Sequence, residues 1–340
     1  MTDAEILVEV WRGPLAESVH RGHAVICDAS GAILEAWGDP EKTILPRSSV
    51  KMLQALPLIE SGAAKTAGLG DEHLALACAS HQGAAIHTDW VARWLADLDM
   101  SEADLRCGDQ VPDDRAAKHA LIRAHGEPCQ LHNNCSGKHS GFLTLTRHLG
   151  AGPEYVEPDH PVQRAVLEAF EEMTGETSPG YGIDGCSAPN FACSMTGLAR
   201  AMARMAAGEA LGGKRGEAAQ ALVAAMRAHP DLVAGEGRAC TELMRAMDGR
   251  VAIKTGAEAV FTAILPEKGL GIAVKIEDGG VRASECVIAA LLVRLGVLDA
   301  AHPATKGRLD VPVTSRRGIP AGTVRASDAL RRSGGLPALG

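Results

Sequence analysis

Apolar and polar residues alternate with a period of two in several short stretches, the pattern of β-strands with one buried face. Two of the later stretches flank Pro266-Glu267-Lys268-Gly269, a turn-forming sequence that predicts a hairpin. We expect the early stretches to form one half of an antiparallel sheet and the later ones to continue it. The expected strands are 6–11, 18–27, 33–37, 251–254, 259–265 and 271–276, with a further strand near 309–325 before a loose chain end.

Between these groups of strands the apolar residues recur at helical spacing. The expected helices are one that follows Ser48, one that begins inside 132–141, and 87–97, 114–125, 159–174, 194–208, 216–228, 239–247 and 282–295. The pattern therefore predicts a protein of the α/β (α+β) class, with an antiparallel sheet flanked by helices. The sheet is expected from residues 5–37 and 250–325, and the helical region from 48–248. No internal repeat and no linker divides the chain, so we expect a single domain over 1–340.

Composition narrows the class of partner. The formal net charge is −8 and no basic block occurs, which argues against nucleic acid and against an anionic membrane surface. The first residues are acidic and lack a signal-peptide pattern, and no apolar run is long enough to span a bilayer, so we expect a cytoplasmic protein. Nine cysteines in such a protein indicate free thiols or metal ligands in place of a disulfide framework.

Ser48 and Lys51 are the first candidates for chemistry. Pro46 precedes them and a mostly apolar run follows, which predicts a loop that becomes a buried helix with Ser48 or Ser49 at its N-cap. Residues three apart share one face of a helix, so Ser48 and Lys51 can touch whereas Ser49 and Lys51 point apart. A serine becomes a nucleophile when a neighbouring base takes its proton, and a buried lysine is favoured in its neutral, basic form. The simpler alternative is a capping serine followed by a surface lysine.

A second motif, Lys254-Thr255-Gly256, ends a short apolar strand late in the chain. An early Ser-x-x-Lys and a late Lys-Thr-Gly, in this order, are the arrangement of β-lactamases and penicillin-binding proteins. In those enzymes the late strand borders the active site and its lysine faces the serine. The middle Ser-Asp-Asn element is absent here. Ser80-His81-Gln82 and His132-Asn133-Asn134 are the candidates to replace it.

Two polar loops contain cysteines that could bind a metal. Cys135 lies three residues before Lys138 and four before His139, so either side chain can share a helical face with the thiol. The spacing of Cys135 and His139 is one used by zinc ligands, and Cys186 lies in a separate Gly-rich loop. No Cys-x-x-Cys occurs, and buried structural cysteines remain the alternative from spacing alone.

Taken together, these segments resemble the Rhizobium etli-type (class 3) L-asparaginases, within the asparaginase II family. The resemblance extends from about residue 5 to 300, without a departure at the catalytic positions, and gives no match for the last forty residues. The matching segments, in order, are Pro46-Arg47-Ser48-Ser49-Val50-Lys51, Ala79-Ser80-His81, Asn133-Asn134-Cys135-Ser136-Gly137-Lys138-His139, Asp184-Gly185-Cys186, His229-Pro230-x-x-Val233-Ala234-Gly235 and Lys254-Thr255-Gly256-Ala257-Glu258.

This resemblance implies a serine β-lactamase-like and penicillin-binding-protein-like fold, a homodimer, and hydrolysis of L-asparagine to L-aspartate and ammonia. It implies that Ser48 with Lys51, and Ser80 with Lys254, form two Ser–Lys pairs. It also implies one zinc ion per chain, expected to tune substrate binding and not to be essential for the chemistry. The implied zinc ligands, which replace the spacing-based preference for His139, are Cys135, Lys138 and Cys186.

The charged end of an amino-acid substrate needs polar partners from the same loops. The candidates for substrate binding are Arg47, His81, His139, Asp184 and Gly256. Backbone N–H groups at Ser48 and near Gly256 are expected to hold the oxyanion. A glutaminase, or another serine amidohydrolase or peptidase of this fold, is the nearest alternative function. A non-catalytic zinc-binding scaffold would need the two cysteines but not both lysines.

Overall fold

The computed structural model describes residues 3–332, apart from the side chain of Glu209. The chain divides into two compact units. Unit 1 comprises the residues up to Ser49, Cys193–Ala206 and the residues from Glu242 on, and unit 2 comprises Val50–Ala192 and Ala207–Thr241. These units correspond broadly to the expected sheet and the expected helical region. The expectation that 1–340 form a single domain stays a prediction.

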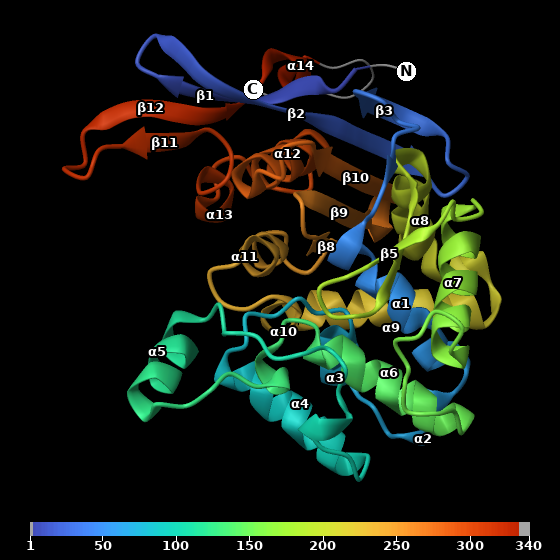
Figure 1. Cartoon of the computed structure of the whole chain (residues 1–340). Helices are drawn as coiled ribbons and strands as arrows, with labels where there is room; N and C mark the ends of the chain where they lie inside the picture. Colours follow the sequence, from blue (N-terminus) through green and yellow to red (C-terminus); the bar gives the residue numbers. More distant parts are fainter. Residues whose placement is uncertain (1–2, 333–340) are drawn as a thin grey trace. The chain divides into compact units, whose positions relative to one another are not determined.

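Unit 1 contains an eight-stranded sheet in which all neighbouring strands are antiparallel (Figure 1). Seven strands follow the order β11-β12-β1-β2-β10-β9-β8, and β3 pairs with the long strand β2. The strands are β1 (Glu5–Arg12), β2 (Leu15–Asp28), β3 (Ile33–Trp37), β8 (Ala252–Thr255), β9 (Val260–Leu265), β10 (Leu270–Ile276), β11 (Val311–Thr314) and β12 (Pro320–Ala326). The structure therefore confirms the predicted mixed α/β class with an antiparallel sheet.

The C-terminal part of unit 1 departs from the expectation. The single strand expected near 309–325 is two strands joined by a turn, because Gly318 adopts a positive φ of 79° and the N–H of Ser315 donates to the carbonyl of Ile319. The expected loose end begins instead with a short helix, α14 (Asp328–Arg331). The guanidinium of Arg294 pairs with Glu35 and donates to the carbonyl of Leu330, which ties this helix to the sheet unit.

Two helices cover much of the sheet in unit 1. Helix α12 (Val281–Arg294) packs along β1, β9, β10 and β12, and α8 (Met195–Ala207) approaches β10 at Gly271. The remaining elements of this unit are β4 (Thr43–Ile44), β7 (Cys193–Ser194), the 3₁₀ helix η5 (Pro266–Lys268) and α13 (Pro303–Lys306). Three elements include a change of unit along the chain, namely the 3₁₀ helix η1 (Arg47–Val50), α8 at its last residue, Ala207, and α11 (Ala239–Ala246).

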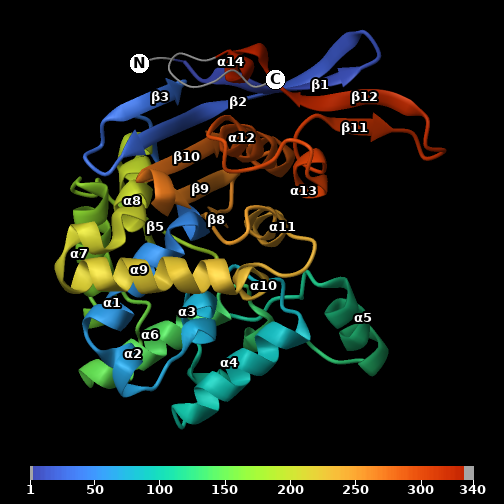
Figure 2. The same cartoon turned by 180° about the vertical axis from the view of Figure 1, so that it is seen from behind.

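Unit 2 is mostly helical, and its α1 (Lys51–Glu60) packs against α6 (Ser136–Leu149), α7 (Pro161–Thr174) and α9 (Gly213–Ala228) (Figure 2). A two-stranded hairpin completes it, β5 (Tyr181–Ile183) and β6 (Pro189–Phe191). The other helices are α2 (Ala63–Thr66), α3 (Asp71–Ala77), α4 (Ala85–Asp97), α5 (Arg115–Ala124), α10 (Pro230–Val233) and the 3₁₀ helices η2 (Glu102–Asp104), η3 (Gln130–His132) and η4 (Gly208–Leu211). The expected helices of this region are confirmed to within a few residues at each end.

The start of α1 differs from the expectation. Ser48 and Ser49 lie inside the 3₁₀ turn η1, and Val50 is the N-cap residue, without a side-chain hydrogen bond. The hydroxyl of Ser49 donates backward to the carbonyl of Pro46 at 2.7 Å, so it does not cap the helix. The prediction of a serine N-cap is therefore wrong, whereas the prediction of a buried helix is confirmed because Lys51 through Leu58 are all buried.

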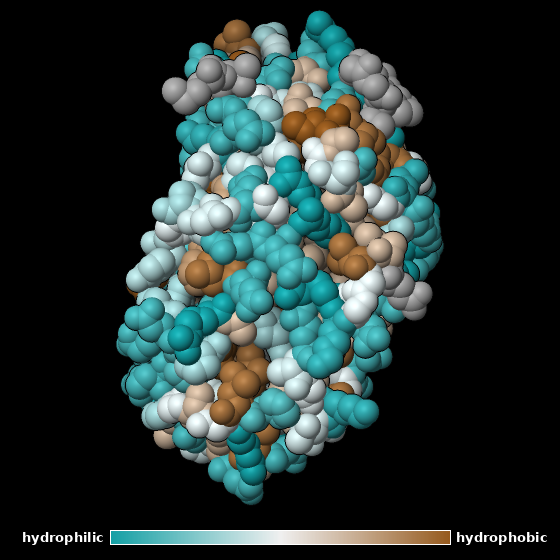
Figure 3. All heavy atoms as spheres, turned by 90° about the vertical axis from the view of Figure 1, so that its right-hand side faces the viewer, coloured by the Kyte–Doolittle hydropathy of each residue, from teal (hydrophilic) through white to brown (hydrophobic). Residues whose placement is uncertain are grey.

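Hydrophobic side chains on the surface occur in separate patches among hydrophilic residues on the face shown in Figure 3. Within the described part of the chain, no helix is both long enough and apolar enough to cross a bilayer.

Candidate functional site

The turn that carries Ser48 belongs to unit 1. Ser48 is half-buried, whereas Ser49 is fully buried and its hydroxyl donates to the backbone carbonyl of Pro46. Arg47, just before them, adopts a left-handed φ of 55°, a strained backbone conformation for a residue with a side chain. The two serines are adjacent in the chain, but only Ser48 of the pair is partly exposed.

The end of strand β8 supports this turn from within unit 1. A Cβ atom added to Gly256 would lie 2.7 Å from the carbonyl oxygen of Pro46 and 3.0 Å from the backbone nitrogen of Ser49. The Thr262 hydroxyl donates to the carbonyl of Ser49 at 3.1 Å. Glycine is therefore required at position 256 because the backbones of the two segments are in contact.

The backbone of Gly256 is not free for an oxyanion. Its N–H donates to the carbonyl of Val260 at 2.7 Å, as part of the tight turn that joins β8 to β9. Glu258 and Ala259 in that turn both have φ near 55°. An oxyanion donor from this turn must therefore be an N–H other than that of Gly256.

Lys254 is the candidate lysine of unit 1. Its side chain is 1% exposed, and Nζ donates to the carbonyl of Thr255 at 2.7 Å. The strand of which it is part is buried along Ala252, Ile253 and Lys254, so its amine is surrounded by protein.

Lys51 is the candidate lysine of unit 2, and its side chain has no exposed surface. Nζ donates to two backbone carbonyls, those of Ala79 and, at 3.4 Å, Asn134. No carboxylate of the described residues forms an ion pair with it. The Lys51 amine is therefore held by backbone carbonyls.

Ser80 and His81 lie in a buried loop of the same unit. The N–H of Ser80 donates to the carbonyl of Val233, and that of His81 to the carbonyl of Asn134. The His81 ring contacts the Ser136 hydroxyl through Nε2 at 2.9 Å and accepts the N–H of Gly83 through Nδ1. Both ring nitrogens have partners, so this geometry gives His81 a role in holding the loop and does not support substrate binding by its ring.

The three residues implied as zinc ligands meet in unit 2. Cys135 directly precedes α6, and Lys138 is in the first turn of that helix. Cys186 comes from the loop between β5 and β6, and Lys138 Nζ donates to its sulfur at 3.1 Å. Cys135 interacts with Cys186, and its thiol donates to the side-chain oxygen of Asn134 at 3.0 Å. The structure thus brings two sulfurs and one amine together from segments about fifty residues apart.

Protonation in this cluster follows from its contacts. Interaction with Cys135 and the nearby Lys138 charge hold the pKa of Cys186 well below its ordinary value, against the effect of burial. The interaction with Cys186, together with burial, raises the pKa of Cys135. Burial by itself would lower the pKa of Lys138, but the two cysteines outweigh it and raise that pKa. These directions favour a Cys186 thiolate beside a Lys138 ammonium, with Cys135 as the thiol.

This donor set fits zinc, which binds thiolates and nitrogen lone pairs. Binding would require Lys138 and Cys135 to lose their protons, so that metal and protons compete for the same atoms. Among the described residues, no group of three or more His, Cys, Asp or Glu is arranged as metal ligands. The set of Cys135, Lys138 and Cys186 differs from such a group because one of its three donors is a lysine.

His139 and Asp184 lie beside this cluster. His139 is fully buried, and burial together with the charge of Lys138 lowers its pKa well below 6.5. Its Nδ1 lies 2.8 Å from the hydroxyl of Tyr155, a residue that sequence reasoning missed. Asp184 is half-buried at the start of the tight loop that presents Cys186, and its N–H bonds to the carbonyl of Ala188. Tyr155 has no motif spacing to His139, so no sequence signal could have found it.

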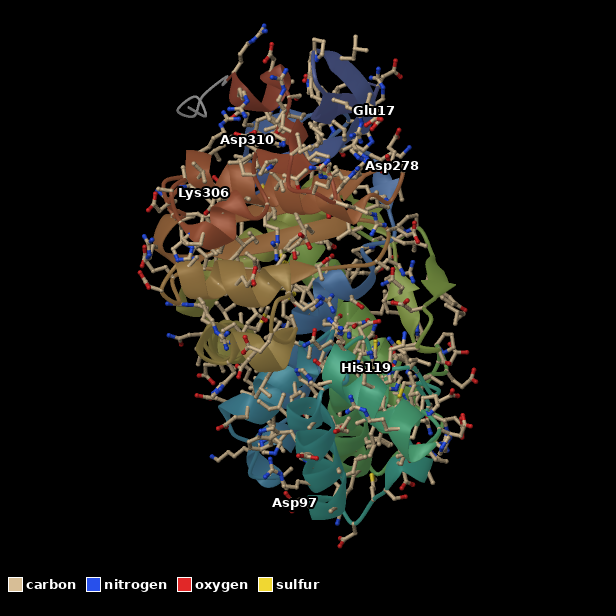
Figure 4. All side chains as sticks on the ribbon, turned by 90° about the vertical axis from the view of Figure 1, so that its left-hand side faces the viewer. Glu17, Asp97, His119, Asp278, Lys306 and Asp310 are labelled. Atoms are coloured by element: carbon tan, nitrogen blue, oxygen red, sulfur yellow. The ribbon has the colours of Figure 1, made fainter. Side chains whose placement is uncertain are left out.

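A buried histidine in unit 1, His20, is not part of a candidate site. His20 contacts Asp278 through Nδ1 at 2.6 Å and accepts from Arg282 through Nε2 at 2.9 Å. Asp278 lies at the surface (labelled in Figure 4). Because both ring nitrogens are occupied, His20 has none left for a metal or a substrate.

The family model described as L-asparaginase II matches residues 8–326. No curated protein matches the chain. Among solved structures, Mglu in its native form is 14% identical with a TM-score of 0.45, over 89% of this chain and 70% of that one. A β-lactamase from Mycobacterium bovis is 13% identical with a TM-score of 0.36, over 77% and 89%. A putative β-lactamase from Bacteroides dorei is 10% identical with a TM-score of 0.42, over 75% and 84%.

The family match covers nearly the whole chain, including every candidate residue described above. The protein belongs to the L-asparaginase II family. It is accordingly a hydrolase of the L-asparaginase class, as the motifs predicted.

Proposed function

We propose that this enzyme hydrolyses L-asparagine to L-aspartate and ammonia through an acyl-enzyme, with Ser48 as the nucleophile and Lys51 as its base. The observation that carries the proposal is the environment of these side chains. Lys51 is completely buried among neutral carbonyls, three residues after a half-buried Ser48, whereas the alternative nucleophile Ser49 already donates to Pro46. Family membership supports the substrate class.

In the proposed reaction, neutral Lys51 takes the proton of Ser48 as the serine oxygen attacks the side-chain carboxamide carbon. Backbone N–H groups stabilise the oxyanion, a contribution of about 10²–10³ in rate for each donor. Collapse of the tetrahedral intermediate releases ammonia, protonated by the second pair, Lys254 and Ser80. Water then hydrolyses the aspartyl ester and restores the Ser48 hydroxyl. The assignment of the second pair rests on the resemblance to class 3 asparaginases.

The test is ammonia release by the purified enzyme from L-asparagine, measured beside L-glutamine and a β-lactam. We expect asparagine to be the preferred substrate and Ser48 to carry the aspartyl group in rapidly quenched samples, detected by peptide mass spectrometry. One methylene of substrate length is worth only about 1–3 kcal/mol of discrimination, so slow glutamine turnover is compatible with the proposal. Faster hydrolysis of glutamine would support the glutaminase alternative, and no ammonia from either amide would support a non-catalytic scaffold.

We also propose that Cys135, Lys138 and Cys186 hold one zinc ion per chain. When bound, zinc would supply a fixed positive charge beside the substrate's carboxylate, while the serine and lysine residues supply the nucleophile and proton transfers. Elemental analysis should find about one zinc per chain, lost in Cys135→Ser and Cys186→Ser. Chelation should raise the KM for asparagine more than it lowers kcat. Unchelated protein without zinc would contradict this assignment.

We also propose that the enzyme is a homodimer and that it is located in the cytoplasm. Sedimentation equilibrium of the native enzyme tests the oligomeric state.

A further inference from the structure

His139 has one ring nitrogen with a partner and one without. On α6, its Nδ1 lies 2.8 Å from the Tyr155 hydroxyl, and its ring packs edge-on against that of Tyr155 at 5.4 Å between centroids. Its Nε2 is buried and has no hydrogen-bond partner among the described residues. Buried polar atoms are nearly always hydrogen-bonded in folded proteins, so an orphaned one indicates a bound partner, either an ordered water or a ligand.

The contacts of Tyr155 determine which nitrogen carries the proton. The backbone N–H of Arg106 donates to the Tyr155 oxygen at 2.7 Å. Tyr155 has no exposed surface, and burial raises the pKa of its hydroxyl, which therefore keeps its single proton. The one acceptor for that proton among the described residues is His139 Nδ1. Because Nδ1 accepts, the ring proton of neutral His139 is on Nε2.

Arg106 is itself held in place. Its guanidinium pairs with Glu154, the residue before Tyr155, and donates to the backbone carbonyls of Ala103, Asp104 and Leu105. This fixes the backbone N–H that points at the Tyr155 oxygen. The chain of donors therefore runs from Arg106 through Tyr155 to His139 and ends in an unused N–H.

The unused N–H lies in the neighbourhood of the cysteine cluster. The His139 ring has four charged or ionisable groups around it that influence its pKa electrostatically, all in unit 2. They are Lys138, Cys135, Lys51 and Asp184. No acceptor among them takes the Nε2 proton. The acceptor is therefore a bound water or a bound ligand, and a carboxylate oxygen is the strongest acceptor that an amino-acid substrate offers.

We propose that Tyr155 is a positioning residue, which with the Arg106 N–H holds His139 as the Nε2–H tautomer so that His139 donates to a carboxylate oxygen of the substrate. This inference rests on the proposed amino-acid substrate. It also has a consequence for the metal site. His139 has no lone pair to offer at Nε2, so it is not a zinc ligand despite its four-residue spacing from Cys135.

The test compares Tyr155→Phe with wild type. The variant loses one hydroxyl and keeps the ring that packs on His139 and Phe142. The protein has one other tyrosine, Tyr181, which is 52% exposed, so Tyr181→Phe is a matched control for loss of a tyrosine hydroxyl. Nitrogen NMR of protein labelled with ¹⁵N-histidine, without substrate, should show His139 protonated at Nε2 in wild type and in Tyr181→Phe. In Tyr155→Phe the Nδ1–H tautomer should become populated.

Kinetics provide the second readout. Tyr155→Phe should raise the KM for asparagine about ten-fold and leave kcat within a factor of about three, since it removes ground-state binding. His139→Gln, which keeps an N–H near the Nε2 position, should retain more affinity than His139→Asn. Zinc content should be the same in all four variants, which gives a readout independent of turnover.

The outcomes separate this inference from the proposed function. An active wild type with His139 protonated at Nδ1, or a Tyr155→Phe enzyme with unchanged KM, would overturn the positioning role and leave the asparaginase assignment intact. Loss of zinc in His139→Gln would also overturn it, because His139 would then be a ligand. If wild type released no ammonia, the substrate role would fall while the tautomer measurement would still decide the role of Tyr155.

Discussion

Ser48 and Ser49 are adjacent residues with different surroundings. The Ser49 hydroxyl is buried and donates to Pro46, whereas Ser48 is half-buried and lies three residues before Lys51 in consecutive helical turns. A hydroxyl that is already committed to a carbonyl within a buried turn cannot easily attack a substrate. The difference between the two serines is therefore one of hydrogen bonding and exposure, not of residue type.

Substitution of each serine provides a direct test of this difference. Ser48→Ala should reduce kcat for asparagine by at least about 10⁴, because it removes the nucleophile while leaving the fold intact. Ser49→Ala should retain activity and lose about 1 kcal/mol of stability with its buried hydrogen bond. Steady-state ammonia release and urea unfolding measure the two effects. Near wild-type turnover by Ser48→Ala would refute the proposed mechanism.

Lys51 can be tested by a change that keeps its charge. Arginine does not give up its proton in proteins, so Lys51→Arg should lower kcat by about 10²–10⁴, the usual range for loss of a general base. Lys306, which is exposed, is a matched site where Lys306→Arg should change nothing. The measurement is kcat at saturating asparagine for both variants. Substantial activity in Lys51→Arg would mean that a residue other than Lys51 is the base.

At the scale of elements, close backbone contacts position the candidate residues. In unit 1, Gly256 lets the end of β8 touch the turn of Ser48, and Gly271 lets β10 touch α8. A Cβ atom at Gly271 would lie 2.1 Å from the carbonyl oxygen of Ala199 and 2.3 Å from the nitrogen of Ala203. Both atoms belong to the backbone of α8, so the helix itself would have to move.

Gly271→Ala should therefore destabilise the protein by about 1–3 kcal/mol, the usual cost of overpacking a well-packed interior. Gly152→Ala is the control, because nothing lies within 4 Å of the added methyl group there. Urea unfolding at neutral pH, followed by circular dichroism, measures both variants. A Gly271→Ala protein as stable as wild type would show that α8 can shift away from β10 at little cost.

At the scale of the whole molecule, buried neutral histidines couple stability to pH. In unit 2 the rings of His81 and His87 stack at 4.7 Å, and burial lowers the pKa of both below 6.5. The folded state therefore binds fewer protons than the unfolded state at mildly acidic pH. The stability that these residues contribute is fully present above about 6.5 and is lost as the pH falls below it, by about 1.4 kcal/mol per pH unit for each histidine that stays neutral.

His87→Gln should remove one of these contributions. Glutamine keeps an N–H that can donate to the carbonyl of Asp231, as His87 Nε2 does at 2.9 Å, but it does not titrate. The slope of unfolding free energy against pH, measured between about 5 and 6.5, should become shallower than in wild type, by up to about 1.4 kcal/mol per pH unit. An unchanged slope would mean that His87 binds a proton in the folded state as readily as in the unfolded one.

The sequence alone predicted most of the longer strands and helices, and the family. Periodicity located the strands of unit 1 and the helices of unit 2, because apolar spacing depends on which face each element buries. The motifs around Ser48, Ser80, Cys135 and Lys254 indicated an L-asparaginase, and the family match over residues 8–326 agrees with them. Local rules failed at helix ends: Ser49 is a better N-cap residue than Val50 by propensity, but its hydroxyl bonds to Pro46.

Tertiary structure decided what each candidate side chain contacts. No local pattern indicates that Lys138 donates to Cys186 or that the Gly256 N–H donates to the carbonyl of Val260. Nor does one indicate that both ring nitrogens of His81 have hydrogen-bond partners. The same holds for Tyr155, which reaches His139 from a separate loop. These contacts join residues far apart in the chain, and they depend on packing and on the need to satisfy buried polar atoms, which act only once the chain is folded.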